Sequence, residues 1–600
     1  MSRAALALAA IVAAGTLTYG ALGGLLRGPS VFADELIYMD ATRSVADGHR
    51  PMERDQPYGR GLLFPVAAAP IVALAPNQLD AYRGLKWFNA FVFSLAAIPA
   101  FFLARRFLSE GWSLVVAGLT AAVPSSVYSG MVLTEAAAYV TGTLALLALL
   151  QVIERPTARR QLYALGAVAL AALARPQLVA LGAALPVGLA LRWWLLPKMT
   201  RPRVSTALRR LWPTAAAVGF VVVLGAAAFA SGHASLRDYR DVFTTYDVVD
   251  VARWSWYTLG NLGLYVAIVP LVAAPAAVAD LCRRGRAGSV QDASFLGLFL
   301  TVNVVTILLV AAFSSATFGG GRLHDRYLFY VIPLWLVLFA LWLVRGAPAS
   351  WRSLALGCGL MALLLVTIPQ NLLLRDTNLQ FDAVATAVWA RLRAVDPARP
   401  GVLRLLLVVA VLGALGAIVA ARRGSPAIRP LLLVPIALVF VGNAVFVWES
   451  RAHDADLMVF ADDRAATWSW VDRAVPDDAE VTDVFVESGP CRPVNIGPFR
   501  MTEFFNARIT PVLRVGVPAD ITTDGRSVRI GADGIVRTLD GKEITAQYAV
   551  LPPGVAVKGH VIAQGTLANL RLWKVGGTLR FPHANSNAAA VASACPAGTT

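Results

Sequence analysis

Charged residues are scarce in this 600-residue chain, at 15% against 57% hydrophobic residues, and the mean hydropathy is +0.61. So little polar surface cannot cover a chain of this length in water, which excludes a soluble globular protein. Apolar runs near 20 residues long recur along the chain, and a helix of that length crosses a bilayer. The composition therefore predicts a polytopic α-helical membrane protein.

Cysteine is also scarce, with four residues. Four cysteines in this arrangement indicate neither a disulfide framework nor a cysteine-based metal site. The sequence also contains no pairs of His and Asp at a fixed spacing that would indicate another kind of metal centre. Cys491 and Cys595 are both expected outside the membrane, where a disulfide can persist. A bridge and two free thiols therefore both stay open.

Basic residues outnumber acidic ones, and the formal net charge is +16. A basic chain can bind nucleic acid, but here Lys and Arg gather in short loops between apolar runs, for example Arg105-Arg106 and Arg283-Arg284. This distribution is typical of positive loops on the cytoplasmic side of a membrane. The charge therefore indicates topology, and no nucleic-acid partner is expected.

The first apolar run, residues 4–26, is longer than the core of a signal peptide, so we expect a retained span; a cleaved leader is the alternative. A cytoplasmic N-terminus places the residues after this span on the outer face. The Pro-broken run 61–76 is best taken as a re-entrant or interfacial helix, because the Arg-rich loops then gather inside. We predict about thirteen spans, at residues 4–26, 84–107, 112–130, 132–153, 161–174, 177–196, 211–231, 257–281, 293–313, 327–345, 352–369, 401–421 and 429–448. The outer loops are then 27–83, 232–256, 314–326 and 371–400.

The composition changes after Trp448. The long apolar runs end, and short alternating segments with turns such as Asp540-Gly541 read as strands. We therefore predict a transmembrane domain over 1–448, an extracytoplasmic, mostly β domain over 449–582, and an Ala/Ser-rich flexible tail over 583–600.

Two adjacent carboxylates, Asp34 and Glu35, follow the first span directly. They begin a segment, residues 34–48, whose apolar positions allow a helix lying on the membrane surface. The dipole of such a helix favours a carboxylate near its start, so an N-cap aspartate is the structural alternative. An ionised carboxylate at a membrane face can also act as a general base. Asp34 is the candidate catalytic base, with Glu35 as the alternative.

A second motif is His-Asp-Arg-Tyr at 324–327, preceded by Gly-Gly-Gly-Arg at 319–322. It places a glycine-rich loop and several cations at the outer end of a span. Arg holds phosphate oxygens with a planar fork, and exposed backbone N–H groups can add to it. His324 and Arg326 are therefore candidates for binding phosphate. The alternative is a positive loop that anchors the span, although positive charge outside opposes the usual bias.

Further candidates lie on the same predicted face. Arg60 stands between two glycines, after Tyr58, and could supply another cation for phosphate. Glu135 is expected near the outer end of its span and Arg175 in a tight hairpin, so a structural ion pair between the two is the favoured interpretation. Tyr58, Glu135, Arg175 and Tyr327 are also candidates for lining a cleft.

These features resemble the GT-C superfamily of integral membrane glycosyltransferases, in particular the protein O-mannosyltransferase and aminoarabinose transferase group and actinobacterial relatives that build cell-wall glycans. The resemblance covers about residues 1–345 and rests on the acidic pair, the Tyr-Gly-Arg-Gly-Leu-Leu-Phe-Pro stretch at 58–65 and the longer element at 324–333. In that family the first external loop carries the catalytic acidic residue, which matches Asp34. An arginine near the later external loop is linked to the donor phosphate, which matches Arg326. The C-terminal β domain is similar to accessory domains of mycobacterial arabinofuranosyltransferases.

The resemblance implies an inverting transferase that moves a sugar from a polyprenyl-phosphate donor to a cell-envelope glycan, lipid or protein on the outer face of a bacterial plasma membrane. Asp34 would deprotonate the acceptor hydroxyl, and Arg326, His324 and Arg60 would stabilise the leaving phosphate. Arabinose, mannose and galactose are the candidate sugars. No cofactor is certain, and since some family members use a divalent metal, metal dependence stays open.

Three alternatives remain. A ligase or polymerase that uses diphosphate-linked glycans is barely separated from a monophosphate user by the sequence. A transporter would carry ionisable groups near the membrane midplane and two related halves, whereas the candidate groups here gather on one face. A non-catalytic membrane scaffold that presents the β domain is the remaining alternative.

Overall fold

The computed structural model describes most of the chain: residues 2–29, 33–53, 56–230, 247–316, 321–373, 382–389, 391, 400–459, 468–486, 497–515, 526–553, 555–565 and 569–582. These fall into two compact units. Unit 1 comprises Met1–Gly20, Ala90–Ser129 and Thr134–Ser450, and unit 2 comprises Ala21–Asn89, Gly130–Leu133 and Arg451–Thr600. Cys491 and Cys595, for which a bridge and two free thiols were both left open, lie outside the described residues, as do the tail 583–600 and the first two glycines of the 319–322 loop.

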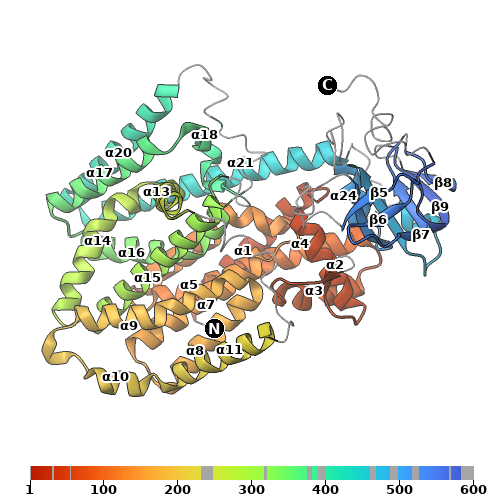
Figure 1. Cartoon of the computed structure of the whole chain (residues 1–600). Helices are drawn as coiled ribbons and strands as arrows, with labels where there is room; N and C mark the ends of the chain where they lie inside the picture. The colour runs from red at the N-terminus through yellow and green to blue at the C-terminus, as the bar shows by residue number, and fades with distance from the viewer. Residues whose placement is uncertain are drawn as a thin grey trace. The chain divides into compact units, whose positions relative to one another are not determined.

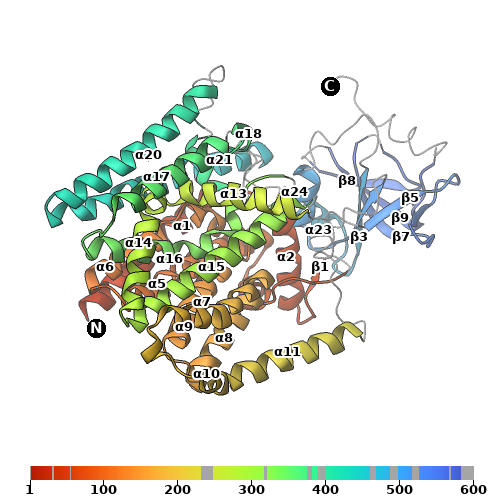
Figure 2. The ribbon, with the colours of Figure 1, turned by 60° about the vertical axis from the view of Figure 1, so that its left-hand side comes forward.

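Unit 1 is built from helices (Figures 1 and 2), with bounds as follows: α1 Arg3–Leu25, α5 Ala97–Ala104, α6 Glu110–Ala121, α7 Glu135–Glu154, α8 Ala158–Ala174, α9 Ala184–Leu195, α10 Val204–Arg210, α11 Trp212–Ala230, α13 Val248–Tyr265, α14 Val269–Arg286, α15 Val290–Ser315, α16 Ile332–Val344, α17 Trp351–Thr367, α18 Gln370–Leu373, α20 Pro400–Arg423 and α21 Val434–Val459. Short 3-10 turns connect them: η1 Pro124–Gly130, η2 Pro176–Ala183, η3 Lys198–Thr200, η6 Asp325–Tyr327, η7 Phe329–Val331, η8 Val384–Thr386 and η9 Pro426–Leu433. Helices α1 and α21 run on into unit 2 at one end.

The chain is a multi-pass membrane protein. Within the described ranges, 7 helical segments are long and apolar enough to cross a bilayer, or up to 9 if each of two bent pairs counts as one span. Every one of the thirteen predicted spans falls on helix. The number that cross the membrane stays a prediction.

Two predicted spans are bent: residues 112–130 bend by 55° between α6 and η1, and residues 257–281 bend more sharply. Residues 257–281 form α13 and α14, which meet at 105°. The break holds Ala267 and Ile268 at positive φ (65° and 67°), a region that costs energy for non-glycine residues. Pro270, in the first turn of α14, has no N–H to continue the helix and restricts the residue before it. The apolar run in the sequence is therefore continuous, although the helix is interrupted at residues 267–268.

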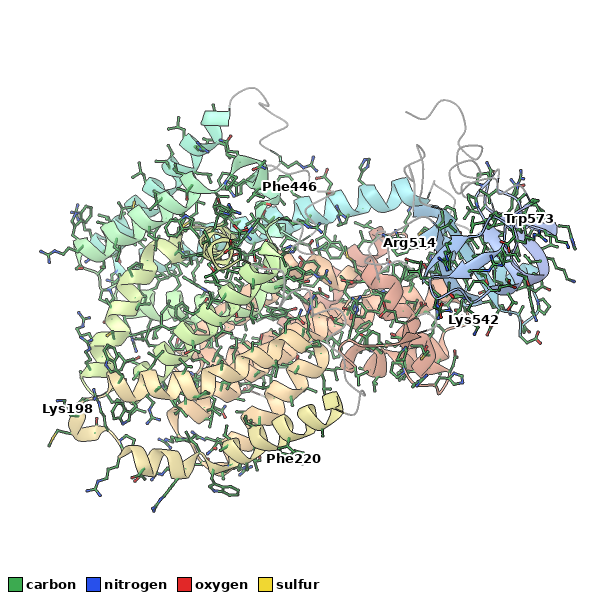
Figure 3. The ribbon with its side chains drawn as sticks, viewed as in Figure 1. Lys198, Phe220, Phe446, Arg514, Lys542 and Trp573 are labelled. Atoms are coloured by element: carbon green, nitrogen blue, oxygen red, sulfur yellow. The ribbon has the colours of Figure 1, made fainter. Side chains whose placement is uncertain are left out.

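Small residues let the helices of unit 1 approach closely. A Cβ added to Gly297 of α15 would lie 2.6 Å from the carbonyl oxygen of Gly188 on α9, which is the packing typical of helices in a bilayer. Large apolar side chains also remain on the outside, such as Phe220 of α11, 64% exposed (Figure 3). In a membrane protein such residues contact lipid, so their exposure needs no protein partner.

Unit 2 combines α2 (Ala33–Ala46), α3 (Leu63–Leu74) and α4 (Gln78–Ser94), whose last turns enter unit 1, with a C-terminal sheet. The apolar run 61–76 thus forms a helix of 12 residues, too short for an upright crossing. A two-stranded ribbon, β1 (Met52–Glu53) with β2 (Gln56–Pro57), links α2 to α3. Helix α2 packs on α3 and on the C-terminal helix α24 (Gly497–Phe505).

The predicted β domain is confirmed as a seven-stranded mixed sheet (blue in Figure 1). The strands are β3 Val481–Val486, β4 Ile509–Val515, β5 Arg526–Ile530, β6 Val536–Thr538, β7 Thr545–Leu551, β8 His560–Gln564 and β9 Arg571–Thr578. Their order in the sheet is β6-β5-β4-β3-β7-β9-β8, with parallel pairs β3–β4, β3–β7 and β4–β5. The short helix α23 (Trp470–Ala474) contacts β8, and the turn predicted at Asp540-Gly541 follows β6, with Gly541 at φ 92°.

The predicted boundary at residue 448 falls inside a helix. Helix α21 does not stop where its apolar run ends but continues through charged residues to Val459. The division into domains at 448 and 582 therefore stays a prediction.

Candidate functional site

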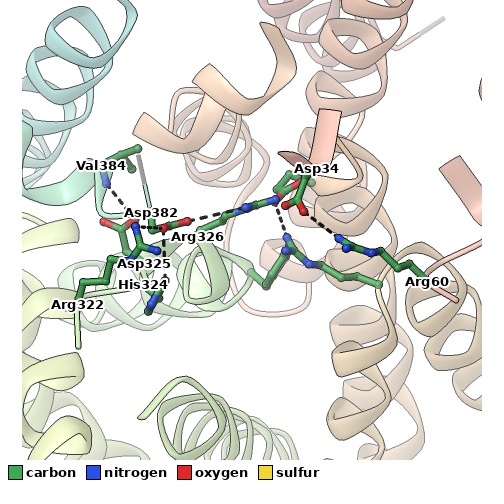
Figure 4. A network of polar contacts seen from close by, with 11 residues as sticks. Asp34, Arg60, Arg322, His324, Asp325, Arg326, Asp382 and Val384 are labelled. Atoms are coloured by element: carbon green, nitrogen blue, oxygen red, sulfur yellow. Dashed lines mark hydrogen bonds and ion pairs between the residues drawn. The ribbon is translucent and has the colours of Figure 1, made fainter. Parts of the chain in front are cut away.

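Asp34 forms an ion pair within unit 2. It lies in the first turn of α2, and its Oδ1 accepts a hydrogen bond from Nη1 of Arg60 at 2.8 Å (Figure 4). Both side chains keep some exposure, 22% for Asp34 and 18% for Arg60. Glu53 adds a second carboxylate 4.0 Å from Nη2 of Arg60. We call Asp34, Glu53, Tyr58 and Arg60 the Asp34 cluster.

Tyr58 and Arg60 are held in place by their neighbours. The Tyr58 hydroxyl donates to the carbonyl of Gly61 at 3.1 Å, and its ring packs edge-on against Tyr38 of α2. Burial raises the pKa of Tyr58, so the phenol stays protonated. Burial lowers the pKa of Arg60, but the Asp34 carboxylate and other neighbours more than offset this and the net shift is upward. Arg60 is therefore a permanent cation beside Asp34.

Glu35 has a different environment from its neighbour Asp34. Its side chain is fully buried, and its Oε2 accepts the backbone N–H of Val132 at 3.0 Å. Lys86 of α4 interacts electrostatically with this carboxylate and donates to the carbonyl of Leu26. The two adjacent carboxylates thus differ in their exposure. Asp34 is partly exposed, whereas the buried Glu35 connects α2 to the segment that contains Val132.

A second group of charges lies in unit 1, around Glu135, and includes Arg326 and Asp382 (Figure 4). Glu135 is the first residue of α7 and is fully buried, and its Oε1 accepts from Nη1 of Arg175 at 2.6 Å and from Nε of Arg326. Arg175, between α8 and η2, also donates to the Tyr330 hydroxyl at 3.1 Å and lies over the ring of Tyr327. The predicted ion pair between Glu135 and Arg175 is confirmed.

Asp382 gathers the cations of the 321–327 loop. Its carboxylate lies 3.5 Å from Nη1 of Arg322, 3.7 Å from Nδ1 of His324 and 3.8 Å from Nη1 of Arg326. Its carbonyl accepts the backbone N–H of Arg326 at 3.0 Å. Among the cations, Arg322 keeps 37% of its side chain exposed, whereas Arg326 keeps 2%. We call Glu135, Arg175, Arg322, His324, Arg326 and Asp382 the Arg326 cluster.

Asp325 points away from these cations to η8. Its two oxygens accept the backbone N–H groups of Val384 (3.0 Å) and Ala385 (2.7 Å). Burial raises the pKa of this carboxyl to about 8, with the two N–H donors opposing the shift. Asp325 therefore fastens the loop to η8.

The structure brings the predicted site residues together in two groups. Asp34, Tyr58 and Arg60 meet in unit 2, and Glu135, Arg175, His324, Arg326 and Tyr327 meet in unit 1. That all of them serve one outer surface stays a prediction. Sequence reasoning missed Asp382, which stands in a loop without a motif, and did not select Arg322, although the glycine-rich stretch before it was a signal.

No cluster of metal ligands is found in the part of the chain that the structure describes: no three His, Cys, Asp or Glu side chains lie where they could hold an ion. Metal dependence stays open.

The helical membrane part has the GT-C fold, and a C-terminal β-sheet region is added to it. The chain is similar to ArnT from Cupriavidus metallidurans bound to undecaprenyl phosphate, with 15% identity and a TM-score of 0.51, over 97% of this chain and 98% of that one. ArnT in the apo state matches with the same identity and TM-score, over 98% and 99%. At this identity the likeness establishes the fold.

A weaker likeness links the chain to the archaeal oligosaccharyltransferase AglB from Archaeoglobus fulgidus, in complex with an inhibitory peptide and a dolichol-phosphate. The identity is 12% and the TM-score 0.40, over 83% of this chain and 64% of that one. No protein-family model matches the chain, and no curated protein sequence does.

Proposed function

We propose that the chain is a glycosyltransferase that moves a sugar from a polyprenyl-phosphate donor to an acceptor hydroxyl at the outer face of a bacterial plasma membrane. The observation that carries this proposal is the Asp34 carboxylate, partly exposed and paired with Arg60, directly after the first span. The GT-C fold supports it, because ArnT shares that fold over nearly the whole chain and was solved with undecaprenyl phosphate.

Asp34 is the proposed general base. Its carboxylate takes the proton of the acceptor hydroxyl as the oxygen attacks the anomeric carbon. The bond from that carbon to the phosphate oxygen breaks, its electrons go to the oxygen, and polyprenyl phosphate leaves. A single displacement of this kind inverts the anomeric centre. Arg60 orients the carboxylate, and Glu35 is a positioning residue because its side chain is buried.

The Arg326 cluster is proposed to stabilise the phosphate. Among the described residues of the cluster, three arginines face the carboxylates of Glu135 and Asp382. Fixed cations aimed at developing charge make a separate general acid unnecessary for a phosphate leaving group. Arg322 is the most exposed of the three arginines and is proposed to contact the phosphate directly. The buried Arg326 and Arg175 are proposed to add positive electrostatic potential at the phosphate and to hold the loop in place.

The finer assignments rest on the sequence resemblance. An arabinofuranosyl or mannosyl donor and a cell-wall glycan acceptor are proposed, with lipid and protein acceptors as alternatives. The C-terminal β-rich unit is proposed to lie on the same outer side.

The test is release of polyprenyl phosphate by purified, detergent-solubilised protein from a panel of polyprenyl-phosphate sugars. We expect release from one sugar, loss of release in Asp34→Asn, and wild-type release in the matched control Asp47→Asn, which removes the same charge from an exposed position just after α2. Release from diphosphate-linked donors instead would establish the ligase alternative. A folded wild type that releases nothing from any donor would count against the proposed function.

A further inference from the structure

Unit 2 contains a cavity of about 500 Å³ that the proposed transfer step does not use. It is a half-open cleft lined by the end of α3, the start of α4, and the C-terminal helices α23 and α24. The volume falls within the range of about 300–1,000 Å³ that small-molecule sites occupy.

The lining indicates a neutral, hydroxyl-rich ligand. The polar side chains at the wall are the amides of Asn77 and Gln78, the hydroxyl of Ser469 and the carboxylate of Asp472, and no Lys or Arg is among the described lining residues. Phosphate groups are bound through cations and their forked N–H donors, so a phosphorylated ligand fits poorly. Phe505 and several aliphatic side chains supply the apolar part. Amide, hydroxyl and carboxylate groups beside apolar side chains suit a sugar, which has apolar C–H faces and hydroxyl edges.

The C-terminal wall of the cavity is held rigidly. The Asn506 amide donates to the carbonyls of Trp468 (2.8 Å) and Thr502 (2.7 Å) and accepts the backbone N–H of Asp472 at 3.0 Å. The Asp472 carboxylate in turn accepts the N–H of Ala507 at 2.8 Å. A fixed carboxylate loses little entropy when a ligand binds.

The cavity is also tied to the helix that carries Asp34. Arg43, on α2, donates to Oε1 of Gln78 at 3.2 Å and to the carbonyl of Phe504. Arg43 and Asp34 are nine residues apart on α2, which is about 13 Å along the helix axis at 1.5 Å per residue. The cavity wall is therefore connected to Asp34 through α2.

We propose that this cavity binds a neutral oligosaccharide, the non-reacting part of the acceptor glycan. The proposal rests on the proposed function. Binding energy from this remote part would orient the reacting hydroxyl, which makes the attack effectively intramolecular. An acceptor of one sugar would lack this contact.

The test measures binding of linear neutral oligosaccharides of arabinose, galactose, mannose and glucose to the full chain by isothermal titration calorimetry. Ala75→Phe adds a ring at the cavity wall, where the backbone is extended (φ −75°, ψ 136°) and accepts Phe. Ala73→Phe adds the same ring at an exposed position of α3 that does not line the cavity. Ser469→Ala removes one hydroxyl from the wall without adding bulk.

We expect one class of oligosaccharide to bind wild type and Ala73→Phe equally, Ala75→Phe at least tenfold more weakly, and Ser469→Ala at least threefold more weakly. Failure of every oligosaccharide to bind wild type, or equal affinity in wild type and both wall variants, would overturn the proposal. The proposal would also be overturned if the cavity bound a peptide instead of a sugar and Ala75→Phe abolished that binding. Release of polyprenyl phosphate to water, without acceptor, is measured in parallel and should be unchanged in Ala75→Phe. If wild type releases no polyprenyl phosphate, the proposed function is contradicted. If wild type releases polyprenyl phosphate but binds no oligosaccharide, only the proposal of this binding site is contradicted.

Discussion

Replacement of Glu135 by Gln tests the Arg326 cluster most severely. The carboxylate is fully buried and pairs with Arg175 and Arg326, which are only 5% and 2% exposed. Removing one partner of a buried ion pair typically costs about 3–5 kcal/mol, because the remaining charge is left without compensation. Asp382 stays 3.8 Å from Arg326 and compensates in part, so we expect a loss near the lower limit, about 3 kcal/mol.

The assay is thermal unfolding of detergent-purified protein followed by tryptophan fluorescence. All variants are scanned at one rate, because large membrane proteins often unfold irreversibly and the apparent Tm then depends on that rate. Glu110→Gln is the matched control: it makes the same change at the exposed first residue of α6, where the interaction with the helix dipole is worth less than about 1 kcal/mol.

A double variant separates the ion pair from other effects. Glu135→Gln combined with Arg175→Gln removes a buried cation together with its partner, so part of the lost stability should return. Equal apparent Tm values for Glu135→Gln and Glu110→Gln would refute the reasoning, since the buried carboxylate would then contribute no more than an exposed one.

Two further predictions concern pH and packing. Burial raises the pKa of Asp325 to about 8, above the value of about 3.9 in an unfolded chain, so the folded chain holds this proton more tightly and its stability should fall as pH rises from about 4 to 8. In Asp325→Asn that part of the Tm–pH profile should vanish; an unchanged profile contradicts the assignment. Gly297→Ala should lower the Tm because its Cβ would meet the Gly188 backbone, at a cost of about 1–3 kcal/mol. Gly166→Ala, whose Cβ meets no described atom within 4 Å, should leave the Tm unchanged or raise it.

The membrane part was predictable because its signal is local. A run of about 20 apolar residues forms a helix in a bilayer whatever its neighbours do, and positive loops then set which span ends share a face. The Glu135–Arg175 pair followed from that rule, as both were expected at the outer ends of adjacent spans. The break at 267–268 did not follow, because the apolar run is continuous there and the bend depends on the backbone. Helix α21 outlasts its apolar run, since charged residues end a membrane span but not a helix.

Long-range partners were harder to predict. Asp382 joins the 321–327 loop from a segment with no motif and no periodicity, so only the folded chain identifies it. The order of the C-terminal strands likewise depends on pairings between distant segments, such as β3 with β7. The roles of the two adjacent carboxylates, Asp34 and Glu35, were equally hard to predict. Sequence left Asp34 and Glu35 as alternatives, and only burial and partners separate the exposed carboxylate from the buried one.

The measurement that tests the central claim most directly is sugar-dependent release of polyprenyl phosphate by wild type, Asp34→Asn and Asp47→Asn, with elution on size exclusion as the check of folding. The account predicts release by wild type and Asp47→Asn, and a loss of at least about 100-fold in Asp34→Asn, the range in which general-base catalysis contributes. Release by Asp34→Asn at the wild-type rate would contradict the assignment of Asp34 as the base.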